Sequence, residues 1–265
     1  MSFEGAIPEV YERYTVPLLF RPYARDLARR LAERHPRDVL ELAAGTGAVT
    51  RELAAVLPRD TSMTATDLSR PMLDRARALP LPRPVRWVEA DAGALPFPDG
   101  SCDAVLCQFG VMFFPDRPRA FGEARRVLRP GGVLLFNVWQ ALGANDFVAV
   151  TEAVAAGLFP ADPPDFLSRV PYGYHDVAAI TRDLAAGGFT GAPRIETVAR
   201  PGRAGSAQDV ATALCRGTPL RDEIEARGGR TLDEVTRAVG SALAERFGPG
   251  PVEGPLSALV VTVTR

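Results

Sequence analysis

Residues 39–47 read VLELAAGTG, an apolar run of strand length that carries a glutamate and ends in a turn of small residues. The apolar side chains after the turn form one stripe at helical spacing, with Val49, Leu53, Val56 and Leu57. In a doubly wound sheet ligands bind at such a strand–turn–helix, because the helix N-terminus presents free N–H groups and partial positive charge. Gly45 and Gly47 would let a ligand approach the backbone without meeting a Cβ atom. Taken alone, the pattern is also that of an ordinary tight turn.

The alternation of strand and helix continues along the chain. Apolar runs predict strands at 38–43, 63–67, 85–90, 104–109 and 133–139, with helices at 71–79 and 116–128. This rhythm predicts right-handed crossovers and a parallel sheet covered on both faces. After Trp139 the connection is too long for a simple crossover, which predicts a lid over one end of the sheet. A strand at 195–199, helices capped by Ser206 and Thr231, and an alternating strand at 257–264 complete the chain.

Two further acids stand at predicted strand ends. Asp67 ends the second strand, where two acceptor oxygens suit a ribose diol. Asp91 ends the third strand, where an acceptor could meet an exocyclic adenine amine. Each acid could also be a helix cap or a solvated loop residue. Three acids at successive strand ends nevertheless favour one ligand at the carboxyl edge of the sheet.

Composition excludes several classes of function. The net charge of −1 supplies no field for polyanions, so nucleic acid is not the expected partner. All 31 basic residues are Arg, which excludes Schiff-base and Walker-type lysine chemistry. No apolar run reaches the roughly 18 residues of a membrane span. The cysteines and histidines do not have zinc-ligand spacing, so no metal is expected.

The same composition indicates a cytoplasmic protein. The N-terminal segment carries Glu4, Glu9 and Glu12 and lacks an apolar stretch, which argues against a signal peptide. The three cysteines fit small core residues of a reduced protein. A small-molecule partner is expected, and a homodimer is one oligomeric state that the sequence leaves open.

Residues 38–138 resemble the class I S-adenosylmethionine-dependent methyltransferases, close to the UbiE-like small-molecule branch. Besides the glycine turn, the motifs that carry the resemblance are TDLSRPML at 66–73, Asp91-Ala92 with LPF at 95–97, SCDAV at 101–105 and EARRVLRPGG at 123–132. The chain departs from many relatives at Ala43 and Ala44, where these have Gly and Cys. That departure affects the expected shape of the turn and not the expected fold.

The resemblance implies an α/β fold with a Rossmann-like, seven-stranded, mostly parallel sheet, helices on both faces, an antiparallel last strand and a helical lid inserted after the fifth strand. A single methyltransferase domain is then expected over residues 1–265. Its expected parts are an N-terminal helical cap (1–36), a cofactor-binding core (37–140), the lid insertion (141–188) and the strands and helices that complete the sheet (189–265).

The resemblance also implies a site for S-adenosylmethionine. The glycine turn would cradle the methionine part, Asp67 would take the ribose hydroxyls, and Asp91 would read adenine. The expected cofactor-binding residues are Tyr14, Glu41, Ala43, Ala44, Gly45, Thr46, Gly47, Asp67, Leu68, Met72, Asp91, Ala92, Gln108 and Phe109. The expected substrate-binding residues are Met112, Phe113, Trp139, Phe166, Tyr172 and Tyr174, which together favour an apolar or aromatic acceptor.

The expected reaction is a direct displacement to O, N or C of a small, largely apolar metabolite, which needs alignment and exclusion of water and no covalent catalyst. His175 is the candidate base if the acceptor must lose a proton, although it could equally be structural beside Asp176. Two alternatives remain: a non-catalytic protein that binds the cofactor, and a nicotinamide oxidoreductase. Thr50 disfavours the second, because the dinucleotide fingerprint needs glycine or alanine at that position. A nucleic-acid methylase is disfavoured because residues 108–110 read QFG and not an N/D-P-P-Y motif.

Overall fold

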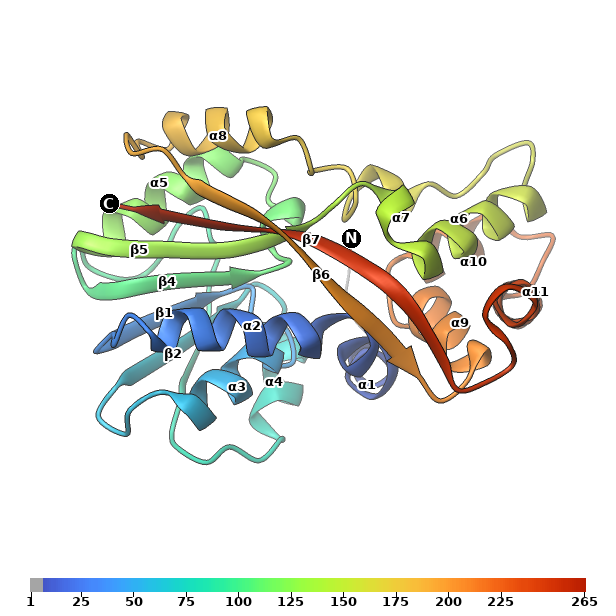
Figure 1. Ribbon diagram of the computed structural model, residues 1–265, viewed down its shortest axis with the longest axis horizontal. Coiled ribbons are helices and arrows are strands. Elements are labelled where there is room, and N and C mark those ends of the chain that lie inside the picture. Colours follow the sequence, from blue (N-terminus) through green and yellow to red (C-terminus); the bar gives the residue numbers. More distant parts are fainter. Residues whose placement is uncertain (1–6) are drawn as a thin grey trace. The chain divides into compact units, whose positions relative to one another are not determined.

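A computed structural model describes residues 7–265, so Glu4 and the start of the expected N-terminal cap lie outside the described residues. Its sheet has seven strands in the order β3-β2-β1-β4-β5-β7-β6 (Figure 1). The strands are β1 (Asp38–Leu42), β2 (Ser62–Asp67), β3 (Arg86–Glu89), β4 (Cys102–Gln108), β5 (Leu128–Trp139), β6 (Arg194–Ala204) and β7 (Val252–Thr264). Strands β1 to β5 pair in parallel and β7 pairs antiparallel with β5, which confirms the expected fold class.

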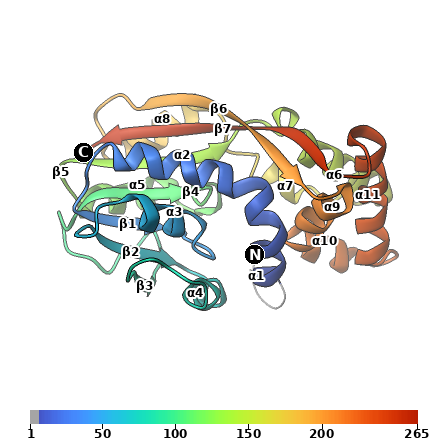
Figure 2. The same ribbon diagram turned by 60° about the horizontal axis from the view of Figure 1, so that its bottom comes forward.

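The chain forms two compact units. The second unit comprises Tyr23–Trp139, Tyr174–Val198 and Ala258–Arg265 and holds β1 to β5. Its helices are α2 (Arg21–Ala32, from Tyr23 on), α3 (Ala48–Val56), α4 (Arg70–Arg77), α5 (Arg117–Val127) and α8 (Val177–Ala186). Helix α2 runs along the sheet (Figure 2), and α5 packs against α8. This unit contains the glycine turn and all three acids at the strand ends.

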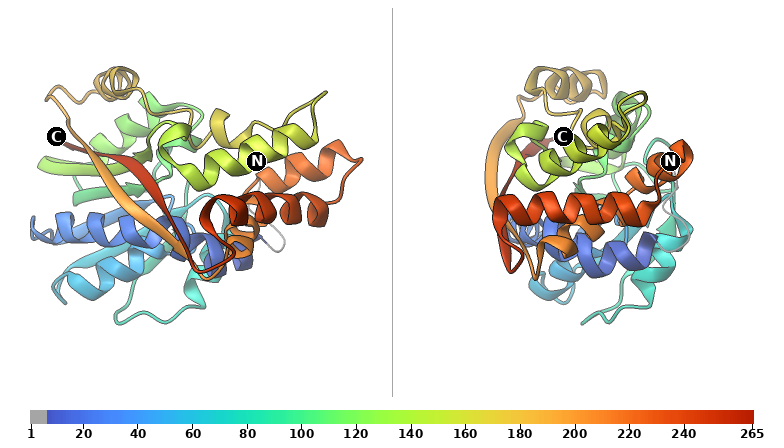
Figure 3. Two further views of the ribbon diagram at one scale, coloured as in Figure 1. Left: turned by 45° about the vertical axis from the view of Figure 1, so that its right-hand side comes forward. Right: turned by 90° about the vertical axis from the view of Figure 1, so that its right-hand side faces the viewer.

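The first unit comprises the described part of Met1–Pro22 together with Gln140–Gly173 and Ala199–Ser257. Its helices are α1 (Ile7–Val10), the π-helix η1 (Tyr11–Phe20), α6 (Asp146–Leu158), α7 (Phe166–Arg169), α9 (Ala207–Arg216), α10 (Leu220–Arg227) and α11 (Leu232–Phe247). Helices α9 and α11 lie side by side (Figure 3). Thr231 and Glu234 form the expected capping box at the start of α11. Residues 141–188 are thus divided: α6 and α7 belong to the first unit and α8 to the second, and their role as a lid stays a prediction.

Three strands extend several residues beyond the sequence prediction. Strand β6 ends at Ala204, five residues after the strand predicted at 195–199. Strand β5 begins at Leu128, five residues before the predicted start, and includes the Pro-Gly-Gly segment. Main-chain hydrogen bonds fix the residues just before this strand: the N–H groups of Gly100 and Ser101 donate to the carbonyl oxygens of Arg126 and Val127. Strand β7 likewise begins at Val252, five residues before the strand predicted at 257–264. Extended backbone can continue through Gly and Pro where neighbouring strands provide partners, which local propensity does not reveal. Within residues 7–265, no helix is long and apolar enough to cross a membrane.

A carboxylate at the start of β4 links the amino ends of three strands. Asp103 accepts hydrogen bonds from the N–H groups of Arg37 (2.9 Å) and Asp38 (3.0 Å) before and in β1. Its other oxygen accepts from the guanidinium of Arg129 in β5 at 2.7 Å. Burial raises the pKa of Asp103, but these hydrogen bonds outweigh it and leave the pKa below its ordinary value.

We expect Asp103→Asn to destabilise the protein at neutral pH. A depressed carboxyl pKa stabilises the fold above the ordinary pKa of 3.8, and this contribution is lost as the pH falls toward the folded-state value. The deficit in unfolding free energy should therefore shrink below about pH 4, as measured by urea unfolding at several pH values. Asp60→Asn, which changes an exposed carboxylate, is the control. An equal deficit at pH 3 and pH 7 would contradict the ionic role of Asp103.

Candidate active site

The turn between β1 and α3 adopts a left-handed backbone at alternate positions. Ala43, Gly45 and Gly47 have φ angles of 51°, 56° and 80°. At Gly47 an added Cβ would lie 2.9 Å from the Trp87 ring, so glycine is required there for both conformation and space. Ala43 carries a Cβ atom in the same left-handed conformation, which is strained for a residue other than glycine. The chain is thereby folded tightly around the N-terminus of α3.

The loop after β4 packs against this turn. A Cβ added to Gly110 would lie 2.4 Å from the Cβ of Ala43, so the two backbones are in close contact. The preceding residue, Phe109, also has a positive φ of 50°. Its N–H group donates to both the main-chain oxygen and Oδ1 of Asn137 in β5, at 3.2 Å and 3.0 Å. Asn137, which the sequence analysis did not identify, therefore holds the turn after β4 in place.

Glu41 is buried at the carboxyl end of β1, with 2% of its surface exposed. The hydroxyl of Thr50, in the first turn of α3, donates to its Oε2 at 2.6 Å. Burial raises the pKa of Glu41 to about 8, an effect only partly opposed by the Thr50 hydrogen bond and by Arg51. Thr50 is a second residue that the sequence analysis did not place in the site. The available signal was a hydroxyl in the first helical turn after the glycines.

Asp67 joins the end of β2 to the glycine turn. One carboxylate oxygen accepts from the Gly45 N–H at 2.7 Å, and the other accepts from the Ser69 N–H at 2.8 Å. Burial raises its pKa above the ordinary value, while these backbone hydrogen bonds lower it. The adjoining Leu68 is 70% exposed, an unusual state for a large apolar side chain, whereas Met72 is buried.

Asp91 follows the neighbouring strand. The Ala90 N–H donates to the main-chain oxygen of Asp67 at 3.0 Å, which fixes this segment beside the end of β2. Asp91 is exposed, and its Oδ1 accepts from the Gly93 N–H at 2.8 Å. The acids at positions 41, 67 and 91 thus belong to the carboxyl ends of β1, β2 and β3, which are adjacent in the sheet. Their binding of one ligand stays a prediction.

Aromatic side chains lie where β4 and β5 end. The rings of Phe109 and Trp139 stack with centroids 3.8 Å apart, and Tyr23 meets both edge-on at 5.3 Å. All three are buried. Met112 is buried and Phe113 half-buried in the short helix Val111–Phe113 that follows.

The candidate base lies at the start of α8. His175 is half-buried and directly precedes Asp176, whose carboxylate accepts from the Ala178 N–H and caps the helix. On its other side, Tyr174 donates its hydroxyl to Asp183 at 2.7 Å, and the guanidinium of Arg117 lies 4.1 Å from the Tyr174 ring centroid. The catalytic role of His175 and the substrate-binding role of Tyr174 stay predictions.

Three of the expected site residues belong to the first unit. Tyr14 lies in η1, with the guanidinium of Arg13 5.1 Å from its ring centroid. Phe166 begins α7, and Phe166 and Tyr172 are both buried. Their roles in binding also stay predictions.

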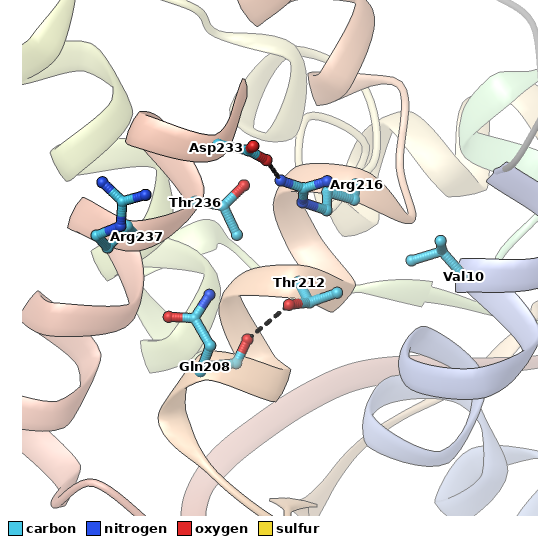
Figure 4. Close-up of a pocket in the computed structure, with 7 residues that line it drawn as sticks. All are labelled: Val10, Gln208, Thr212, Arg216, Asp233, Thr236 and Arg237. Atoms are coloured by element: carbon cyan, nitrogen blue, oxygen red, sulfur yellow. Dashed lines mark hydrogen bonds and ion pairs between the residues drawn. The ribbon is translucent and has the colours of Figure 1, made fainter. Parts of the chain in front are cut away.

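The first unit also contains an open hollow of about 510 Å³ (Figure 4). Its lining comes from Val10 and from residues of α9 and α11, and Arg216 points toward Asp233 across it. Its lining includes two arginines, an aspartate and two threonine hydroxyl groups. The hollow shares no lining residue with the predicted cofactor site, so it does not correspond to that site.

We expect Glu41→Gln to flatten the pH dependence of stability. The folded pKa of about 8 exceeds the ordinary 4.5, so the folded state retains a proton that the unfolded state has lost between these values. Stability should therefore fall as the pH rises from about 4.5 to 8, by up to about 1.4 kcal/mol per pH unit. The amide of Gln can still accept from Thr50 but does not ionise.

Urea unfolding of both proteins at pH 5, 6.5 and 8 measures this effect. The variant should gain stability relative to the parent as the pH rises. The pKa of Asp67 is also raised, so the unfolding free energy of both proteins should still fall somewhat with pH. Parallel curves for the two proteins would show that Glu41 is ionised throughout. Glu52→Gln, a half-buried glutamate on the neighbouring α3, serves as the control.

Comparison with known proteins agrees with this geometry. A protein family described as "Methyltransferase domain" matches residues 40–136. A demethylmenaquinone methyltransferase of Thermus thermophilus is 44% identical over 120 residues, which cover 44% of this chain and 53% of that protein. A UbiE C-methyltransferase of Stutzerimonas stutzeri is 32% identical over 160 residues, covering 59% of this chain and 58% of that protein. The chain thus spans somewhat more than half the length of these curated relatives.

Solved structures show the same fold. The YcgJ protein of Bacillus subtilis superimposes with a TM-score of 0.57 at 19% identity, covering 92% of this chain and 98% of that one. A putative methyltransferase of Bacillus halodurans gives a TM-score of 0.56 at 19% identity, with 91% and 97% covered. Residues 40–136 thus match a methyltransferase domain, and the chain is similar to demethylmenaquinone and UbiE methyltransferases over part of its length.

Proposed function

We propose that the protein binds S-adenosylmethionine and transfers its methyl group to O, N or C of a small, largely apolar metabolite. The observation that carries the proposal is the glycine turn bonded to Asp67 and flanked by Glu41 and Asp91 at the ends of adjacent strands. This arrangement lies within the region that matches a methyltransferase domain. The relatives named for quinone methylation support an apolar acceptor.

The residues present fit the cofactor. The glycine turn brings backbone close to any ligand at the N-terminus of α3, where N–H groups favour anionic oxygens such as a carboxylate. The exposed Leu68 offers an apolar surface beside Asp67, as a purine base next to a ribose requires. Buried carboxyls at positions 41 and 67 favour a cationic ligand, because positive charge stabilises their ionised forms.

When bound, the cofactor supplies a methyl group on a sulfonium, which is already activated for displacement. The chain then has to hold the reactants in line and exclude water. In this proposal the glycine turn holds the methionine end, and Asp67 and Asp91 hold the adenosine end. Phe109 and the residues after it would form the apolar wall toward the acceptor, with π faces that stabilise a nearby cation.

The proposed acceptor is a small molecule and not a nucleic acid, because a net charge of −1 gives no attraction for polyanions. The three cysteines are buried and form no disulfide, which supports a reducing, cytoplasmic setting. A homodimer is the oligomeric state to test first by light scattering.

Calorimetry with S-adenosylhomocysteine and with NAD tests the cofactor assignment. We expect the protein to bind S-adenosylhomocysteine and to prefer it clearly over NAD. Asp91→Asn should weaken that binding by roughly tenfold, since one charge-assisted hydrogen bond is lost. Asp74→Asn is the matched control, because Asp74 is an exposed carboxylate of α4 that pairs with Arg70 and Arg77.

Two results would contradict the proposal in different ways. Preferential binding of NAD would favour a nicotinamide oxidoreductase. Tight binding of S-adenosylmethionine with no methyl transfer to a broad acceptor panel would favour a non-catalytic binding protein.

A separate substitution tests the candidate base. If His175 removes a proton from the acceptor, His175→Ala should lower turnover by about 10²-fold or more and change the shape of the pH–rate profile. Turnover is measured with one accepted substrate from pH 5.5 to 9. His35→Ala is the control, since it changes the other histidine of the chain. An unchanged pH–rate profile in His175→Ala would exclude His175 as the base.

A further inference from the structure

Two buried side-chain amide atoms near the ends of β4 and β5, Oε1 of Gln108 and Nδ2 of Asn137, make no hydrogen bond with any of residues 7–265. Asn137 is fully buried, with 0% of its surface exposed. Burying an unpaired donor or acceptor is costly, and most buried polar groups in proteins are paired. Two such atoms in one place therefore point to a group that the protein itself does not supply.

Strand pairing places these two residues at the same level of the sheet. Gln108 and Asn137 are register partners in the parallel β4–β5 pair. In the β1–β4 pair, Leu42 is the partner of Cys107, so Ala43 of the glycine turn follows at the level of Gln108. The amide pair thus lies at the carboxyl edge of the sheet, next in order to the strand that carries Glu41. Register partners on parallel strands project to the same face.

Asn137 is held in a fixed orientation by its other amide atom. Its Oδ1 accepts from the N–H of Phe109, which directly follows Gln108. With Oδ1 engaged there, Nδ2 is left as a donor, while Oε1 of Gln108 is an acceptor. A single hydroxyl group satisfies both, because it can donate to one atom and accept from the other.

The neighbouring side chains are apolar and aromatic. Phe109 follows Gln108, and Trp139 lies two residues beyond Asn137 on the same face of β5, with the two rings stacked at 3.8 Å. A polar amide pair beside an aromatic wall suits an aromatic ring that bears a hydroxyl group.

We propose that Gln108 and Asn137 form a hydroxyl-recognition site for the methyl acceptor, which selects hydroxylated aromatic molecules. This inference rests on the proposed methyltransferase function and names the substrate class of that same site. The two residues determine specificity: an acceptor without the hydroxyl leaves both amide atoms unpaired in the complex, whereas the correct acceptor pairs them.

The stability of amide variants separates this role from a structural one. Asn145 is a buried asparagine of the first unit whose amide is fully used, donating to Gln140 and Ala141 and accepting from the Ser257 N–H. Asn145→Leu should therefore lower the Tm by several degrees. Gln108→Met should leave the Tm unchanged or raise it, since it removes an unpaired atom and keeps the shape. A fall as large as that of Asn145→Leu would show that Oε1 is satisfied inside the protein and would overturn the proposal.

Binding of matched phenols and ethers tests the recognition itself. Ligand-detected NMR is recorded on the full chain saturated with S-adenosylhomocysteine, using phenol and anisole, 4-ethylphenol and 4-ethylanisole, and 1-naphthol and 1-methoxynaphthalene. We expect the hydroxyl member to bind roughly tenfold more tightly than its ether. This preference should be lost in Gln108→Met and in Asn137→Leu and kept in Asn145→Leu. In Asn137→Leu the Phe109 N–H still has the main-chain oxygen of residue 137 as its acceptor.

Several outcomes would overturn the proposal. No preference in the parent protein, or a preference retained in both variants, would exclude the amide pair as the recognition site. A preference seen only without S-adenosylhomocysteine would assign the pair to a hydroxyl of the cofactor. Failure of S-adenosylhomocysteine to bind would refute the proposed function instead, and the phenol preference could still be measured on the protein alone.

Discussion

The hydrogen bond from the Gly45 N–H to the Asp67 carboxylate is the interaction on which the candidate site depends. It ties the turn after β1 to the end of β2 at 2.7 Å, while the Ala44 N–H donates to the main-chain oxygen of Thr66 at 2.9 Å. These two bonds hold a turn with repeated positive φ angles, which would otherwise be an unfavourable conformation. The N-terminus of α3 is thereby fixed beside the acids that the sheet supplies.

The same arrangement has an electrostatic cost. Burial raises the pKa of both Glu41 and Asp67, and the charge of Asp67 raises the pKa of Glu41 further. Thr50 and the backbone N–H groups offset part of this cost. A site that disfavours its own negative charge is suited to a ligand that brings positive charge.

Much of the fold could be predicted from local sequence, because alternating apolar runs and glycine turns act over a few residues. The five parallel strands and the acids at positions 41, 67 and 91 followed from these signals. Asn137 could not be identified, since an asparagine inside an apolar strand gains its role only when β4 lies beside β5 and Phe109 adopts a positive φ. The division of residues 141–188 between two units was likewise not visible, because long-range packing decides which helices associate.

The contact between Ala43 and Gly110 carries a consequence for how this sequence can change over time. The Cβ of Ala43 occupies the space where a side chain at position 110 would begin, and the sulfur of Cys107 limits that space from the other side. Substitutions at the two loops are therefore not independent, so the same change at position 110 meets less obstruction when position 43 is glycine. Such dependence between neighbouring sites makes the order in which mutations arise important. A lineage that keeps alanine at position 43 should also keep glycine at position 110, because the two positions compete for the same space.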